Sequence, residues 1–548
     1  MPDQNRSQQR SSSSLSVVLA VLASTVMPAA IVAQQIPTDQ AAEGSHASLR
    51  FRYRKLLGPG TIAATANPVV AAYSLTLPVT GTWSVSFGPT TSYGLNTGTV
   101  EARAGKLVTI LVAGMQADTT YHLRAKVKLA GIIDLTDIDH TFTTGSSPVG
   151  IPRKFPVTLG AVGMPQPGIE LVNPVFGAMP STALATDLEG NVIWSYPFAD
   201  KTPGTLLYPF KQLDNGHFLA LVSPLSYPLS GPGPLNALRE FDLAGSTVRE
   251  LTMTALNAAL SSAGFNVTLE NFSHDFARLP NGHTLVLTNT AKDFTDLPGY
   301  PGTTKVVGDV VVDLDRNWKP VWLWNEFDHF DVNRHPWQFP DWTHSNSIAY
   351  SSTDGNFIVS MRHQNWIVKV DYQNGGGNGD VVWRLGQGGD FKLVGGTDPT
   401  DWFYAQHTAI FNSPRTAGVF SLNIMDNGDD RLFPPGVSCG EEDAPACTDT
   451  TIQTLLVDET AKTATLEFHD VLQPSLYSNF GGNAERLKNG NTEFGLSGVT
   501  TGSEIFEVTT DATASTVWQM TLPGSYAYRA QRVRSLYPRE FDGREDSF

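Results

Sequence analysis

The sequence predicts an all-β protein in which a small β-sandwich is followed by a six-bladed β-propeller. Three observations lead to this fold class. Short apolar runs alternate with turns along the 548 residues, Gly (49) and Pro (35) are plentiful, and a unit of about 65 residues recurs in the second part. The chain also exceeds the roughly 250–300 residues at which a single core stops growing, so we expect more than one domain.

Composition excludes several classes of protein. Hydrophobic residues make up 41% of the chain, which excludes a wholly disordered protein. Lys and Arg number 37 against 53 Asp and Glu, which gives a net charge of −16. No nucleic-acid partner is expected, because phosphate binding needs clustered cations and the sequence has no basic tract. Two cysteines exclude a disulfide-dense scaffold and a four-cysteine zinc site.

The first residues, 1–33, are typical of a secretory signal peptide. Two arginines and a serine run precede the uncharged apolar stretch 15–27, which is short for a membrane span, and small residues then lead to a cleavage site near Ala33. An uncleaved anchor stays open as the alternative. We expect a periplasmic or secreted protein without membrane contact after cleavage, in a compartment where Cys439 and Cys447 can pair.

Residues 48–145 alternate apolar and polar residues in short runs, which fits a small β-sandwich. The segment 111–121 ends in Tyr121 and leads into a strand, as a tyrosine corner does. On this feature the region resembles a fibronectin type III module. Such modules space, orient or dimerise a neighbouring domain, so no chemistry is assigned here. Residues 146–158 are expected to be a linker.

The remainder, 159–548, carries two recurring elements. The first is a turn followed by an apolar strand, at Gly216, Gly282, Gly355, Gly490 and, more weakly, Gly418. The second is an apolar strand that ends in an acidic or polar turn, and its six copies predict six blades. Residues 528–538 are expected to close the ring. The alternative is a parallel β-solenoid, which the Asn-Gly hairpin turns disfavour.

Aligning the repeats on their turn glycines brings histidines into comparable positions. The residues near the start of each preceding strand are Tyr208, His274, His344 and His407, with Asn483 in a similar place in the last repeat. Comparable positions of successive blades face one another across the channel of a closed ring. We therefore expect His274, His344 and His407 to converge.

Two further polar residues lie close to this set in the sequence. Asn346 follows His344 by two positions, which predicts that both lie on one face of a strand. Arg362 ends the next apolar strand, and its planar guanidinium suits an oxyanion. Arg362 alone would more often form a salt bridge between blades. Beside three histidines we interpret it as an anion-binding residue.

Four segments carry a resemblance to a known family: HDFARLPNGHTLVL, DWTHSNSI, SMRHQNWIVKVD and AQHTAIFN. They look like the recurring motifs of the bacterial aryl sulfate sulfotransferase family. The resemblance implies a periplasmic six-bladed propeller that moves a sulfuryl group from an aryl sulfate donor to a phenolic acceptor, both small molecules. The family uses no nucleotide sulfate donor, so no cofactor is expected.

The resemblance also assigns roles to residues that match the family's motifs. His407 matches the covalent nucleophile, which implies a ping-pong reaction through a sulfohistidine. His274, His344 and Arg362 match sulfate-binding and acid–base groups, and Asn346 matches a further sulfate contact.

The insertion 426–450, after the strand that follows His407, holds both cysteines. The family has a short-range disulfide at this place, which implies a bond between Cys439 and Cys447. The insertion is acidic and the N-terminal module is generic, so the family's acceptor preference does not transfer to this chain. A homodimer is compatible with the sequence.

Two other functions stay open at the level of the sequence. Three convergent histidines, with Asp275 nearby, could ligate zinc or another divalent cation in a propeller hydrolase. Arg362 argues against this, because a cation beside a metal ion needs extra carboxylates, and no metal ligand is assigned. The second alternative is a non-catalytic propeller that binds an anionic ligand without turnover.

Overall fold

The structure is a computed structural model that describes residues 50–198, 205–224, 235–412, 416–434, 436–441 and 445–537. The predicted signal segment 1–33 lies outside these residues. The chain divides into two compact units, Met1–Arg52 and Tyr53–Phe548, and every strand named below belongs to the second unit. Among the described residues, no helix combines the length and the apolar character needed to cross a bilayer.

Nine strands form the two N-terminal sheets: β1 (Thr61–Ala64), β2 (Ala71–Thr76), β3 (Gly81–Gly88), β4 (Leu95–Asn96), β5 (Val100–Ala102), β6 (Leu107–Val112), β7 (Thr120–Leu129), β8 (Ile133–Thr136) and β9 (His140–Thr143). One sheet has the order β1-β2-β6, and the other has β4-β3-β7-β8, with β5 on β3 and β9 on β7. The Tyr121 hydroxyl accepts a hydrogen bond from the Gln116 N–H (3.0 Å), the contact expected of a tyrosine corner.

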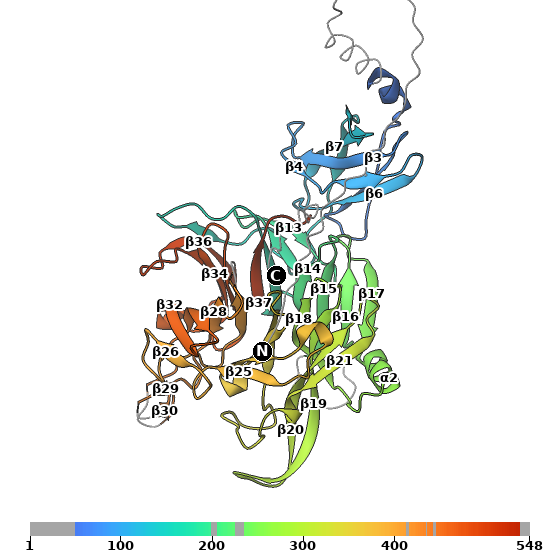
Figure 1. The fold of residues 1–548 in the computed structure, drawn as a ribbon. Helices are drawn as coiled ribbons and strands as arrows, with labels where there is room; N and C mark the ends of the chain where they lie inside the picture. The colour runs from blue at the N-terminus through green and yellow to red at the C-terminus, as the bar shows by residue number, and fades with distance from the viewer. Residues whose placement is uncertain are drawn as a thin grey trace, which may run out of the picture. The chain divides into compact units, whose positions relative to one another are not determined.

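Six further sheets of short, mainly antiparallel strands follow along the described chain (Figure 1). The first contains β11 (Ile169–Gly177), β12 (Leu184–Thr186), β13 (Val192–Ser195) and β37 (Ser525–Val533). The second contains β14 (Thr205–Gln212), β15 (Phe218–Pro224), β16 (Ala237–Phe241) and β17 (Thr247–Thr252). The third contains β18 (Asn271–Arg278), β19 (Thr284–Leu297), β20 (Tyr300–Leu314) and β21 (Pro320–Asn325).

The fourth sheet contains β22 (Ser345–Tyr350), β23 (Phe357–Met361), β24 (Trp366–Val370) and β25 (Val381–Leu385). The fifth contains β27 (Thr408–Phe411), β28 (Val419–Asp426), β31 (Thr451–Asp458), β32 (Thr463–Val471) and the edge strand β26 (Lys392–Val394). The sixth contains β33 (Asn483–Arg486), β34 (Thr492–Val499), β35 (Gly502–Val508), β36 (Thr516–Pro523) and the edge strand β10 (Val157–Leu159).

Smaller elements join these sheets: the hairpin β29 (Leu432–Phe433) and β30 (Val437–Ser438), the helix α2 (Met253–Ala263), and the 3-10 turns η1 (Glu326–Asp328), η2 (Arg362–Gln364), η3 (Gln373–Gly375) and η4 (Pro474–Leu476). The Thr252 hydroxyl caps the start of α2, and Gly264, with a positive φ of 87°, ends it.

The six elements with an acidic or polar turn predicted from the sequence are all hairpins away from the inner strand of a sheet: β12–β13, β16–β17, β20–β21, β24–β25, β31–β32 and β35–β36. In the fifth and sixth sheets an edge strand, β26 or β10, lies outside the hairpin. The prediction of an all-β chain is therefore confirmed, and its many small sheets are consistent with a propeller-like fold. Hydrophobic side chains fill the space between neighbouring sheets. One cluster, for example, joins Leu285 and Val311 of the third sheet to Val359 and Val368 of the fourth.

The C-terminal strand returns to the first sheet, as predicted. β37 pairs with β11 in antiparallel register (Figure 1). The inner strands β14, β18, β22, β27 and β33 contact one another in turn, and β37 contacts β14. The starts of these strands are thereby brought close together, which positions the candidate site.

One predicted boundary differs from the structure. Residues 146–158 were expected to be a linker, but β10 begins at Val157 and pairs with β36. Edge pairing satisfies backbone groups that an irregular linker would leave to water, and the sequence pattern of three residues was too short to indicate it.

Candidate active site

The three histidines predicted to converge lie together at the starts of inner strands. His274 is within β18, His344 directly precedes β22, and His407 directly precedes β27. The ring centroids of His274 and His344 are 4.5 Å apart, and those of His344 and His407 are 6.3 Å apart. Inner strands of three successive sheets therefore present their imidazoles to one another.

Their backbone positions are not equivalent, in contrast to the shared register expected from the sequence. The φ angle is positive at His274 (51°) and His344 (48°), whereas in the next sheet it is positive at Ala405 (49°), two residues before His407. Such angles are uncommon outside glycine. The β18–β19 pairing is also irregular around His274. His407 instead keeps a regular contact, in which its N–H donates to the Met425 carbonyl (2.9 Å).

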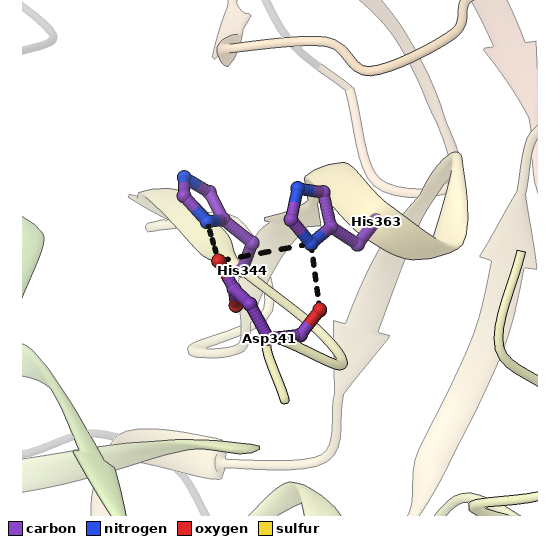
Figure 2. Close-up of side chains that lie close together, drawn as sticks. All are labelled: Asp341, His344 and His363. Atoms are coloured by element: carbon purple, nitrogen blue, oxygen red, sulfur yellow. Dashed lines mark hydrogen bonds and ion pairs between the residues drawn. The ribbon is translucent and has the colours of Figure 1, made fainter. Parts of the chain in front are cut away.

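The two most specific motifs, DWTH (341–344) and RHQ (362–364), are joined by hydrogen bonds. Four consecutive carbonyls accept from the η2 turn: His344 O from Arg362 N–H (3.2 Å), Thr343 O from His363 N–H (3.1 Å), Trp342 O from Gln364 Nε2 (2.7 Å) and Asp341 O from His363 Nδ1 (2.8 Å). Figure 2 shows the last of these. This ladder fixes η2, and with it Arg362, beside the histidines.

Asp341 pairs with His344 in the same view. The distance between Asp341 Oδ2 and His344 Nδ1 is 2.5 Å (Figure 2). Burial would raise the pKa of Asp341, but His344 and then His363 outweigh it and hold that pKa at about 2. Asp341 is therefore ionised at neutral pH. A carboxylate in this place orients the imidazole and compensates the positive charge it takes up during proton transfer.

Asn427, at the end of β28, determines the tautomer of His407. Its Nδ2 donates to the carbonyls of Ser478 (2.6 Å) and Gly481 (3.2 Å), so its oxygen faces His407 Nδ1 at 2.6 Å. An amide oxygen only accepts, so Nδ1 carries the hydrogen and Nε2 keeps a lone pair. Burial, followed by the charges of Arg362 and His344, lowers the pKa of His407 well below its usual value. The result is a neutral imidazole with a nucleophilic Nε2.

Arg362 is held at two nitrogens of its guanidinium. Nη2 donates to Asp429 Oδ2 (2.8 Å) and to the Asn479 carbonyl (3.2 Å), and Nη1 donates to His363 Nε2 (2.6 Å). The Nε–H is buried, and no described residue accepts from it. Burial raises the pKa of Asp429 to about 6, although Arg362 opposes this shift, so the ion pair is mostly charged at pH 7. A fixed guanidinium with a free donor suits an oxyanion.

Two tyrosines border the histidines. The Tyr208 ring lies 6.0 Å from His274, and the Tyr528 ring lies 6.1 Å from His274 and 6.4 Å from His407. Burial raises the pKa of Tyr208 to about 12 and also raises that of Tyr528, so both hydroxyls stay protonated. Tyr208 is one of the residues that the repeat alignment placed with the histidines. Tyr528 lies on the closing strand β37, which that alignment did not include.

Asn346 is bonded to the neighbouring sheet. It is fully buried, and its Nδ2 donates to the Gln406 carbonyl (2.7 Å) in the neighbouring sheet. A register irregularity between Ser345 and Ser347 breaks the period of two on which the prediction relied. Asn483 has a comparable role, since its Oδ1 accepts from the Ala530 N–H (3.1 Å) of β37.

The structure offers little to a divalent metal ion. Asp341, His344 and His363 have potential ligand atoms within 4.8 Å of one another. Both nitrogens of His363 are already engaged, however, and one of them holds the cation Arg362. Asp275, considered as a further ligand, pairs with Lys211 Nζ (2.7 Å) and Arg529 Nη1 (3.1 Å) instead.

The disulfide implied by the resemblance is present, between Cys439 and Cys447. The Cys439 N–H donates to the Arg431 carbonyl (2.9 Å), and Arg431 pairs with Asp426 (2.6 Å). The disulfide loop therefore braces the segment 426–431, which carries the partners of both His407 and Arg362.

Sequence reasoning missed three of these partners: His363, Asn427 and Asp429. His363 follows Arg362 inside a quoted motif, which was the one available signal. Asn427 and Asp429 lie in an acidic insertion without a motif, and their importance comes only from the side chains that the fold brings to them.

Solved structures resemble the chain only weakly. A Bacteroides caccae protein of unknown function is 10% identical with a TM-score of 0.37, over 67% of this chain and all of its own. A Synechocystis apocarotenoid oxygenase is 10% identical with a TM-score of 0.31, over 86% and 95% of the two chains. Dihydro-heme d1 dehydrogenase NirN is 10% identical with a TM-score of 0.29, over 86% and 74%. These likenesses carry no argument about function.

No curated protein sequence matches the chain. Residues 163–529, more than half of it, match the family model described as Arylsulfotransferase (ASST). That match supports an aryl sulfotransferase activity in general and small-molecule substrates. With the histidine and arginine motifs assembled at one place, the chain belongs to the arylsulfotransferase (ASST) family.

Proposed function

We propose that this protein transfers a sulfuryl group from an aryl sulfate ester to a phenolic acceptor in a ping-pong reaction through a sulfohistidine at His407. The observation that carries the proposal is the bond from His407 Nδ1–H to Asn427, which leaves the Nε2 of a neutral imidazole with its lone pair. Arg362, a guanidinium fixed by Asp429 and His363 beside the histidines, supports an anionic substrate.

In the first half-reaction, His407 Nε2 attacks sulfur, and an N–S bond forms while the bond from sulfur to the aryl oxygen breaks. Charge gathers on the sulfuryl oxygens and on the leaving oxygen, as in phosphoryl transfer. Arg362 donates to the sulfuryl oxygens. His344, in its protonated form and paired with Asp341, gives its proton to the leaving oxygen, which otherwise departs as a phenolate of pKa about 10.

In the second half-reaction, the acceptor phenol replaces the product. His344 takes the hydroxyl proton, the phenol oxygen attacks sulfur, and the N–S bond breaks to restore neutral His407. His274 lies against His344, and burial lowers its pKa well below its ordinary value, so it acts as a neutral hydrogen-bonding group. One hydrogen of Asn346 Nδ2 donates to the Gln406 carbonyl, so the sulfate contact that we propose for Asn346 would use the second one.

The fold that we propose for this reaction is a six-bladed propeller, preceded by a fibronectin type III-like module at 48–145 and a linker. The propeller begins at β10 (Val157–Leu159), two residues before the predicted boundary at 159, because β10 pairs with β36. Six sheets of four or five strands and the pairing of β37 with β11 support the ring. Export to the periplasm or the medium, after removal of 1–33, belongs to the proposal. The Cys439–Cys447 disulfide supports an oxidising compartment.

Turnover of 4-nitrophenyl sulfate with phenol tests the function directly. We expect 4-nitrophenol release that depends on phenol, a burst of one equivalent without phenol, and a sulfuryl adduct on His407 by mass spectrometry of quenched enzyme. His407→Asn should abolish the burst while the protein stays folded. Full burst amplitude in that variant would show that transfer is direct or uses another nucleophile.

The two alternatives predict other outcomes of the same assay. A metal-dependent hydrolase would release 4-nitrophenol without phenol dependence and would lose activity with a chelator. A binding module would bind the aryl sulfate without releasing 4-nitrophenol.

A further inference from the structure

His363 contacts Arg362, and both of its ring nitrogens are bonded within the protein. Figure 2 shows the bond between Nδ1 and the Asp341 carbonyl. We propose that His363 is a positioning residue, whose unprotonated Nε2 aims the Arg362 guanidinium at the sulfuryl group. The inference rests on the proposed function, because it names a residue that acts on the donor through Arg362. His363 itself does not touch the substrate.

The tautomer of His363 follows from its first partner. The Asp341 backbone carbonyl can only accept, so the 2.8 Å contact with His363 Nδ1 places the ring hydrogen on Nδ1. Nε2 then carries a lone pair and accepts from Arg362 Nη1 at 2.6 Å. Burial, and next the charge of His344, lowers the pKa of His363 well below its usual value and keeps this acceptor in place.

The guanidinium is fixed from three sides. His363 holds Nη1, Asp429 and the Asn479 carbonyl hold Nη2, and the Trp337 ring covers the guanidinium at 4.6 Å. Trp337 also stacks on His363, with centroids 4.4 Å apart and planes 6° apart. The Nε–H is buried and has no acceptor among the described residues. Nη1 has two hydrogens, and the contact with His363 uses one of them. Loss of the His363 acceptor would allow Nη1 to turn and misdirect its second hydrogen, the donor that we assign to the sulfuryl group.

Two substitutions that introduce amide side chains of different length distinguish a positioning role of His363 from a contribution to packing alone. The amide of His363→Gln reaches the place of Nε2 and can present an oxygen to Arg362. The amide of His363→Asn reaches only the place of Nδ1 and can bond to the Asp341 carbonyl but not to Arg362. Both variants lose the ring that stacks on Trp337, so a packing defect is common to them.

We expect His363→Asn to lower kcat/KM for 4-nitrophenyl sulfate by about 10- to 100-fold. His363→Gln should stay within about threefold of the wild type, with similar melting temperatures for both variants. Equal losses of kcat/KM in the two variants would overturn the inference.

A double-mutant cycle with Arg362→Ala measures the coupling between His363 and Arg362 in kcat/KM, which a purely structural role of His363 would not produce. Without the guanidinium, exchange of His363 for Asn should cost less than about twofold in kcat/KM. The same 10- to 100-fold loss in both backgrounds would mean that His363 acts independently of Arg362.

Failure of the proposed function can be told apart from failure of this inference. If the wild type turns over no aryl sulfate, titration calorimetry with inorganic sulfate measures the anion site alone. Weaker sulfate binding by His363→Asn than by His363→Gln would still support the inference. Equal affinities of the two variants, or no sulfate binding by the wild type, would overturn it.

Discussion

The positions of hydrogens on two imidazoles determine the chemistry at the scale of single residues. In both His407 and His363, Nδ1–H is held by an oxygen that only accepts, so Nε2 keeps its lone pair. The lone pair of His363 accepts from Arg362. In the reaction that we propose, the lone pair of His407 attacks sulfur. Two rings of the same tautomer thus take different roles because of what faces Nε2.

Asn427→Ala tests the tautomer of His407. The variant removes the Nδ1 acceptor, so the ring hydrogen can move to Nε2 and the ring can turn. We expect the burst rate of 4-nitrophenol release to fall about 10- to 100-fold, or roughly 1.4–2.7 kcal/mol of transition-state free energy. The KM should change little, because Asn427 does not contact the substrate. Stopped-flow absorbance measures both.

Asn423→Ala provides the matched control for that variant. Asn423 is also buried in β28, and its Oδ1 accepts from Asn412 Nδ2 (2.9 Å) and Thr454 Oγ1 (2.7 Å). This change should lower the melting temperature by a comparable amount and leave the burst rate intact. A similar loss of burst rate in both variants would mean that Asn427 contributes only to the fold.

The sequence was informative for site residues that can be recognised from their residue type and from the motif around them. Repeat alignment and motif identified His274, His344, His407 and Arg362 as a group, and the structure brings them together. The partner Asn427 could not be found in this way. Its role depends on two carbonyls about fifty residues later in the chain, and such pairing is set by tertiary packing.

At the scale of elements, the end of β28 and the disulfide loop after it form one support for the site. The segment 426–431 bonds to His407 through Asn427 and to Arg362 through Asp429. The loop closed by Cys439 and Cys447 holds that segment through the Arg431 carbonyl. The loop therefore acts on His407 and Arg362 through that segment.

Replacement of both cysteines by serine should lower activity more than stability. The loop spans a sequence separation of only 8, so its closure contributes about 2–3 kcal/mol at most on the chain-entropy model. We expect a modest drop in melting temperature and a kcat lowered about 5- to 50-fold, or roughly 1–2.3 kcal/mol. Calorimetry and steady-state turnover measure the two effects.

A reductant serves as the control for the double serine variant. It should lower the activity of the wild type to the level of the variant and leave the variant unchanged. A lower melting temperature with unchanged kcat would refute the bracing role of the loop.

Elements were predictable where turn chemistry repeats and unpredictable where the backbone departs from regular geometry. All six outer hairpins followed from acidic turns between apolar strands. The irregular pairing around His274 and the positive φ at His344 could not be predicted, because such angles are uncommon outside glycine and no glycine marks either position.

At the scale of the whole molecule, the closing strand carries a buried arginine that links the first and sixth sheets. Arg532 of β37 donates through Nε to Glu170 of β11 (2.7 Å) and through Nη1 to Glu507 of β35 (2.9 Å). Glu493 of β34 lies 3.7 Å from Arg532 Nε, and all four side chains are fully buried. Three carboxyl groups thus share one guanidinium, which compensates a single negative charge.

The pKa values of two buried carboxyl groups, Glu493 and Glu485, are raised by burial and because one guanidinium cannot compensate all of the negative charges around them. Burial and the charge of Glu170 raise the pKa of Glu493 well above its ordinary value, with Arg532 opposing. The same two causes raise the pKa of Glu485 to about 7. The folded protein therefore holds protons that the unfolded chain releases above its carboxyl pKa of about 4.3. This contribution to stability is complete below that pH and declines as the pH rises towards the folded pKa values.

Glu493→Gln tests this linkage, because the variant keeps the size and hydrogen-bonding capacity of a neutral carboxyl group and cannot ionise. Relative to the wild type, its free energy of unfolding should improve as the pH rises from 5 to 8.5, by up to about 1.4 kcal/mol per pH unit for one proton. Denaturant titrations at intervals across that range measure the difference. Further points near pH 3.5, below the unfolded carboxyl pKa of about 4.3, serve as the internal control, since Glu493 is then mostly protonated in both the folded and the unfolded wild type. Parallel curves for the two proteins across the range would show that Glu493 is ionised in the folded state and that Arg532 outweighs its burial.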